Sequence, residues 1–162
     1  MTGGVLVAGI GNVLQRDDGF GVEVVQRLAG RPVPDGVRVA DFGIRGVHLA
    51  YELLDGYDAL VLVDAVPIGE PPGTVVVMEP DPIAAADAVI DAHTMGPDVV
   101  LATLARLGGE VDRIRVVGCQ PASLEEGVGL SPPVAAAVDG AVDLCLELVA
   151  DIVPPNGKGR GA

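Results

Sequence analysis

Short apolar runs rich in β-branched residues alternate with helical patterns along this chain. The predicted strands are Val5 to Ile10, Val37 to Phe42, Ala59 to Val63, Thr74 to Met78 and Ile114 to Cys119. The predicted helices cover residues 20–30, 47–54, 81–90, 97–107 and 132–153. This alternation is typical of an α/β fold with helices on both faces of a mostly parallel open sheet, here of about five strands. We expect one three-layer domain over residues 1–153 and a disordered tail over residues 154–162.

The apolar positions of the second predicted helix indicate which face it buries. They are Val47, Ala50, Tyr51 and Leu54. His48 lies on the opposite face with Glu52 and Asp55, where we expect it to be solvated. For the last helix, Ser131 is the predicted N-cap and Pro132 the first helical residue.

Candidate chemical groups follow two of the predicted strands and precede one helix. Open α/β sheets bind ligands beyond the carboxyl ends of their strands. Asp17 and Asp18 lie in the loop after the first strand, Asp64 directly follows the third, and His93 lies in the loop before the fourth helix. Two carboxylates and an imidazole suit a divalent transition ion such as Zn, Ni, Fe or Mn, with coordination positions left open.

Each of these residues also has an ordinary structural explanation. Asp17 or Asp18 could cap the first helix, because Asp is a favoured N-cap residue. Asp64 could cap a turn after its strand, and His93 could be a surface loop histidine. Spacing alone leaves these alternatives open.

Composition and charge exclude several classes of function. The formal net charge of −13 and the absence of Trp argue against nucleic-acid binding, which depends on basic and aromatic side chains. No apolar run approaches the roughly 20 residues that span a bilayer, and the N-terminus does not resemble a signal peptide. Cys119 and Cys145 are expected to be reduced, buried residues without a catalytic role. We expect a cytoplasmic protein with no nucleic-acid or membrane partner.

Other enzyme motifs are absent or incomplete. Gly9 and Gly11 begin a dinucleotide-binding pattern, but Leu14 occupies the third glycine position and the loop is acidic, which would repel a pyrophosphate. The loop has no Walker lysine, and the chain has neither a GxSxG nor an HExxH motif. These absences argue against P-loop, serine-hydrolase and zincin chemistry.

The string GIGNVLQRDDGFG, residues 9–21, closely resembles the opening motif GxGNxLxxDDGxG of the hydrogenase maturation proteases. Further segments resemble the same family in the same order along the chain. They are Asp41-Phe42-Gly43, Val63-Asp64-Ala65, the loop around His93, Gln120 to Glu125, and Gly129 to Pro132. The resemblance therefore extends from the first strand to the last helix.

This resemblance implies a phosphorylase/hydrolase-like fold and an endopeptidase activity. The implied substrate is the large-subunit precursor of a nickel-containing hydrogenase, which loses a C-terminal extension after nickel insertion. The implied metal-binding and catalytic residues are Asp18, Asp64 and His93, with Asp18 where some members carry Glu. The nickel would belong to the substrate, so no permanent cofactor is expected. Asp41 is a further catalytic candidate that either orients the substrate or holds the turn at Gly43.

Two other functions would use the same residues. One is a metal-dependent hydrolase that binds its own zinc ion and acts on small amides. The other is a non-enzymatic chaperone whose acidic rim attracts a nickel-loaded subunit.

Overall fold

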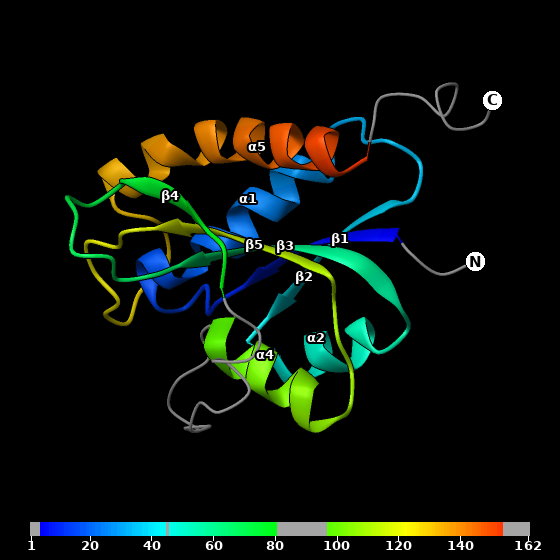
Figure 1. Ribbon diagram of the computed structural model, residues 1–162. Coiled ribbons are helices and arrows are strands. Elements are labelled where there is room, and N and C mark those ends of the chain that lie inside the picture. The colour runs from blue at the N-terminus through cyan, green and yellow to red at the C-terminus, as the bar shows by residue number, and fades with distance from the viewer. Residues whose placement is uncertain (1–3, 45, 81–96, 154–162) are drawn as a thin grey trace.

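A computed structural model describes residues 4–44, 46–80 and 97–153 as a sheet with helices on both sides (Figure 1). The strands are β1 (Gly4–Ile10), β2 (Val37–Gly43), β3 (Tyr57–Ala65), β4 (Val75–Met78) and β5 (Arg113–Cys119). Their order in the sheet is β2-β1-β3-β5-β4. All neighbouring strands are parallel except β4, which is antiparallel to β5. The predicted mostly parallel sheet is confirmed.

The helices form a layer on each face of this sheet. Helices α1 (Phe20–Leu28) and α5 (Pro132–Ile152) lie on one face, and α2 (Gly46–Leu53) and α4 (Pro97–Arg106) lie on the other (Figure 1). A 3-10 turn, η1 (Arg16–Gly19), directly precedes α1. The predicted helix over residues 81–90 and the predicted tail over 154–162 lie outside the described residues.

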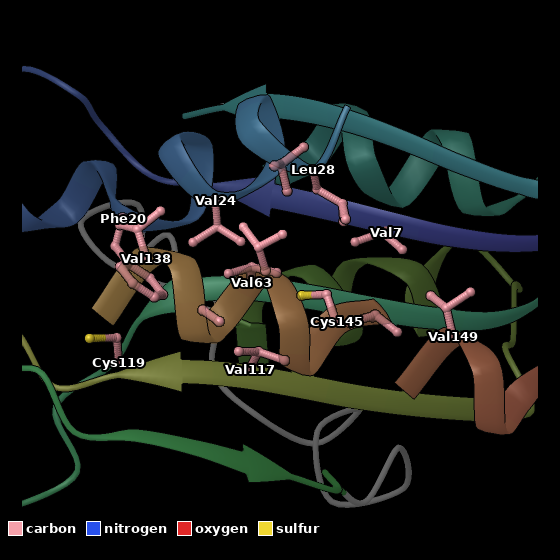
Figure 2. Close-up of a cluster of buried hydrophobic side chains, with 14 of the residues drawn as sticks. Val7, Phe20, Val24, Leu28, Val63, Val117, Cys119, Val138, Cys145 and Val149 are labelled. Carbon is pink, nitrogen blue, oxygen red and sulfur yellow. The ribbon is translucent and has the colours of Figure 1, made fainter. Parts of the chain in front are cut away.

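Each helical layer packs on its own hydrophobic core. Figure 2 shows one core, in which Val7, Val63 and Val117 of the sheet meet side chains of α1 and α5. The second core joins Leu60 and Leu62 to residues of α2 and α4. Successive side chains of β3 therefore enter opposite cores, which explains why this strand is almost purely aliphatic. Within the described ranges, no helix is long and apolar enough to cross a bilayer.

The predicted buried face of α2 is correct for Ala50 and wrong for its other three residues. The helix buries Gly46, Leu49, Ala50 and Leu53, whereas Val47, Tyr51 and Leu54 are exposed. Apolar residues surround most of this short helix, so periodicity alone did not decide which side packs. Its contacts with α4 and with the sheet set the orientation. His48 is exposed, as predicted.

Candidate functional site

Two glycines let α1 begin directly against the carboxyl ends of β1 and β3. A Cβ atom at Gly9 would overlap the carbonyl oxygen of Gly21. A Cβ atom at Gly21 would overlap the carbonyl oxygens of Val63 and Ile10. No side chain fits at either position without movement of backbone. This close approach brings the loop that precedes α1 to the end of β3.

A third glycine folds that loop back on itself. Gly11 has φ of +140°, and a Cβ atom there would overlap the carbonyl oxygen of Asp18. The backbone N–H of Asn12 donates a hydrogen bond of 2.7 Å to Oδ2 of Asp18. The N–H of Gly11 donates to the carbonyl oxygen of Gly43, at the end of β2. Asp18 is thereby held beside the carboxyl ends of β1 and β2.

Asp17 is fully buried and ties this loop to the loop between β5 and α5. Its carboxylate accepts hydrogen bonds from the N–H groups of Ala122 at 2.8 Å, Ser123 at 3.0 Å and Ser131 at 2.7 Å. The hydroxyl of Ser131 also donates to it, at 2.7 Å. Burial raises the pKa of Asp17, but these hydrogen bonds outweigh burial and hold the pKa below its usual value. Asp17 is thus a structural anchor with no free oxygen directed at a ligand.

Neither Asp17 nor Asp18 is an N-cap of the first helix. The N-cap residue of α1 is Gly19, and no side-chain hydrogen bond caps the start of η1 or of α1. Ser131 does occupy the N-cap position of α5, followed by proline, as predicted. Its hydroxyl, however, donates to Asp17 and makes no capping bond.

Asp64 is the second carboxylate of the site and is only 4% exposed. It lies within β3 near the end of the strand, in register with Gly118 of β5. Burial raises the pKa of Asp64 well above its ordinary value, and the negative charge of Asp18 raises it further. A hydrogen bond from the N–H of Ala65 offsets only part of this shift. The 3-10 turn η1, which contains Asp18, contacts β3, so the two carboxylates belong to the same edge of the sheet.

Asp18 is less buried than Asp64, and its pKa is also raised. Burial raises the pKa of Asp18, and the hydrogen bond from Asn12 only partly opposes this. Burial therefore opposes ionisation of both carboxyl groups. A bound cation would stabilise the ionised forms, because its charge offsets the cost of burying them and their mutual repulsion. Carboxylate oxygens are suitable ligands for a divalent metal ion.

The other two predicted site residues are His93 and Asp41. His93 lies outside the described residues. Asp41 is exposed on β2 and lines a surface hollow of about 750 Å³ between β2 and the outer side of α2. Among the residues that the structure describes, no group of three or more His, Cys, Asp or Glu side chains could hold a metal ion. Asp41 therefore does not complete a three-ligand set with Asp18 and Asp64.

Gln120 contributes to the site region in a way that residue patterns did not reveal. It directly follows β5, and its Oε1 accepts hydrogen bonds from the N–H groups of Ile68 and Gly69 in the loop after β3. The side chain thus fixes one of the loops that surround the carboxyl ends of the strands. The available signal was its place in the segment Gln120 to Glu125, which resembles the protease family.

Neither cysteine is suited to act as a nucleophile. Cys119 and Cys145 are free and buried, as predicted. Burial raises the pKa of the Cys119 thiol to about 11 and that of Cys145 to about 12. Both therefore remain protonated near neutral pH, in the form that is a poor nucleophile.

Comparisons with known proteins agree with this architecture and with the motifs around it. The profile of the family described as HycI, hydrogenase maturation protease, matches residues 22–148. The chain is 41% identical over 142 residues to the hydrogenase expression/formation protein HupD of Rhodobacter capsulatus, covering 85% of this chain and 67% of that protein. It is 32% identical over 145 residues to the hydrogenase 2 maturation protease of Escherichia coli strain K12, covering 88% of each. The solved structure of the hydrogenase maturating endopeptidase HybD from E. coli superimposes with a TM-score of 0.79 at 31% identity, over 93% of this chain and 94% of that one. This chain belongs to the hydrogenase maturation protease family and is a maturation endopeptidase.

Proposed function

We propose that this endopeptidase removes the C-terminal extension of a nickel-containing hydrogenase large-subunit precursor, and that it recognises the inserted nickel through Asp18, Asp64 and His93. Membership of the protease family supports the activity. The observation that supports nickel recognition is the position of Asp18 and Asp64 at the carboxyl ends of neighbouring strands, where η1 contacts β3. The negative charge of Asp18 there contributes to the raised pKa of Asp64.

The electrostatics of this pair explain why a metal ion would serve as the recognition signal. Without a cation, ionised Asp64 is destabilised by burial and by the charge of Asp18. A nickel ion that the precursor still holds, with open coordination positions, would bind both carboxylates and remove this penalty. A precursor without nickel lacks this interaction and would bind more weakly. The metal is thus part of the substrate, and the free protease needs no permanent cofactor.

Metal binding would also position the scissile bond. A precursor held through its nickel ion is oriented relative to the protease, and correct orientation alone lowers an activation barrier substantially. Asp41 would contact the substrate chain beside this site, from the hollow along β2.

The processing compartment is the cytoplasm, which fits the two free cysteines. The net charge of −13 makes a nucleic-acid partner unfavourable.

The decisive experiment compares two forms of one precursor. Purified protease is mixed with nickel-loaded and with nickel-free large-subunit precursor, and loss of the C-terminal peptide is followed by mass spectrometry. We expect cleavage of the loaded form only. Equal cleavage of both forms would contradict recognition through nickel. An unchanged precursor mass in both mixtures would favour the chaperone, and stoichiometric zinc in the purified protein would favour the metallohydrolase.

Variants connect the activity to the proposed residues. Asp18→Ala, Asp64→Ala and His93→Ala should each slow processing of the loaded precursor at least ~100-fold, since each removes a ligand that orients the substrate. Asp58→Ala is the matched control, because Asp58 is an exposed carboxylate at the opposite end of β3. Wild-type rates in all three site variants would refute the assignment of these residues.

A further inference from the structure

Strand β2 forms an edge of the sheet, with β1 as its only partner among the described strands. The hydrogen bond from Val5 N–H to the carbonyl oxygen of Gly36 fixes the phase of this pairing, which continues through the partners Val7–Val39 and Gly9–Asp41. The register then shifts between Gly9 and Ile10, and Gly11 N–H donates to Gly43. In a parallel pair, the N–H and C=O groups of one residue point to the same side of the strand, and this side alternates from each residue to the next. Val39 and Asp41 therefore carry N–H and C=O groups that point away from β1. Such a row of backbone groups is a template for an added strand.

The hollow beside this edge combines negative charge with apolar surface. It is lined by Asp41, Phe42 and Gly43 of β2, by Ile44, and by residues on the outer side of α2. Glu52 is already occupied, because it pairs with Arg38 and accepts a hydrogen bond from Tyr57. Asp41 and Asp55 are exposed and have no ion pair among the described residues. The hollow is therefore complementary to a basic side chain that has apolar neighbours.

This edge leads directly to the carboxylate pair. At its carboxyl end, Gly43 accepts the hydrogen bond from Gly11. Gly11 in turn packs against the backbone of Asp18. The carboxyl end of this edge therefore lies beside the loop that carries Asp18.

We propose that the edge of β2 and its hollow bind an extended segment of the precursor that contains at least one Lys or Arg and adds to the sheet as a further strand. Backbone groups of Val39 and Asp41 pair with this segment, and the carboxylates of Asp41 and Asp55 attract its basic side chain. The inference rests on the proposed function, since it names how the same substrate is held. It gives Asp41 a binding role next to the metal-binding pair.

A proline at position 39 tests the backbone pairing. The N–H of Val39 points outward, so Val39→Pro removes a donor from the free edge and leaves the bonds to β1 intact. Val39→Ala is the matched control, because it loses the same side-chain packing and keeps the N–H group. We expect Val39→Pro to raise the KM for nickel-loaded precursor about tenfold above that of Val39→Ala, with kcat unchanged. Equal KM values for the two folded variants would overturn the inference.

A charge reversal tests the hollow independently of the backbone. Asp55 is exposed, so Asp55→Lys does not threaten the fold, and it should raise KM several-fold and weaken the salt dependence of KM. Asp58→Lys is the control at an exposed position outside the hollow. If Val39→Pro fails to fold, the comparison of Asp55→Lys with Asp58→Lys tests the inference alone. An unchanged KM for Asp55→Lys would overturn it. Failure of the wild-type protein to cleave loaded precursor would instead reject the proposed function.

Discussion

At the scale of single residues, two adjacent carboxylates have opposite roles. Asp17 accepts four hydrogen bonds from the loop between β5 and α5 and has a lowered pKa. Asp18 accepts one from Asn12, and burial raises its pKa. The donors to Asp17 lie 105 to 114 residues away along the chain. The residue pattern alone therefore identified an acidic pair but not which member is free to bind a ligand, and only the resemblance to the protease family singled out Asp18.

Asp64 destabilises the fold near neutral pH, because its carboxylate is buried and close to the charge of Asp18. Its folded-state pKa lies above the unfolded value, so the stability of the wild-type protein falls as pH rises through the folded-state pKa. We expect Asp64→Asn to increase the free energy of unfolding at pH 7 by on the order of 1 kcal/mol or more, while processing is lost. Chemical denaturation of the metal-free protein measures this gain.

The same variant has a defined pH signature. Below the ordinary pKa of an aspartate the wild-type carboxyl group is protonated in both the folded and the unfolded state, so the advantage of Asp64→Asn should disappear there. Asp58→Asn, at an exposed position, should show no comparable gain at any pH. An Asp64→Asn protein less stable than wild type at pH 7 would contradict this account of the site.

At the scale of elements, the packing of α1 on β1 and β3 positions the loop that carries Asp18. Two facing glycines, Gly9 and Gly21, allow this contact, and each would be blocked by a single Cβ atom. These two glycines of the opening motif are therefore required for the close packing of α1 on the sheet, a role distinct from phosphate binding. Helix α1 was correctly predicted from the spacing of its apolar residues. Its short distance from the sheet depends on the contacts of Gly9 and Gly21.

Two Gly→Ala substitutions separate this contact from helix propensity. Gly21→Ala should lower the free energy of unfolding by at least ~2 kcal/mol, because the methyl group meets backbone oxygen atoms that cannot move aside. Gly140→Ala in α5 is the control, since nothing lies within 4 Å of its Cβ position. It should instead stabilise the protein by about 0.5–1 kcal/mol. Thermal or urea denaturation measures both values, and similar effects at the two sites would argue against the close contact.

At the scale of the whole molecule, the strand order places the ends of β1 and β3 side by side and so unites Asp18 with Asp64. The two residues are far apart in an unfolded chain, which means that a metal ion held by both binds the folded state selectively. Formation of the sheet thus brings two acidic residues that are distant in sequence into one site.

Nickel should accordingly stabilise the folded protein. At a free Ni²⁺ concentration ten times its Kd, the free energy of unfolding should rise by about 1.4 kcal/mol. Asp18→Asn and Asp64→Asn should abolish this increase, and Asp58→Asn should retain it. Thermal melts with and without Ni²⁺ provide the measurement. Retention of the full increase in both site variants would show that the ion binds elsewhere.

The sequence by itself determined the strands, most of the helices, the parallel sheet and the family, because hydrophobic periodicity and a long glycine–acid motif are local properties of the chain. Tertiary structure alone decided that Asp17 is an anchor, that Asp64 is buried against the charge of Asp18, that α2 exposes Val47 and Tyr51, and that Asp41 faces a separate hollow. These features depend on partners distant in sequence. Hydrogen-bond donors, burial and charge repulsion at a strand end arise only when the loops meet across the sheet.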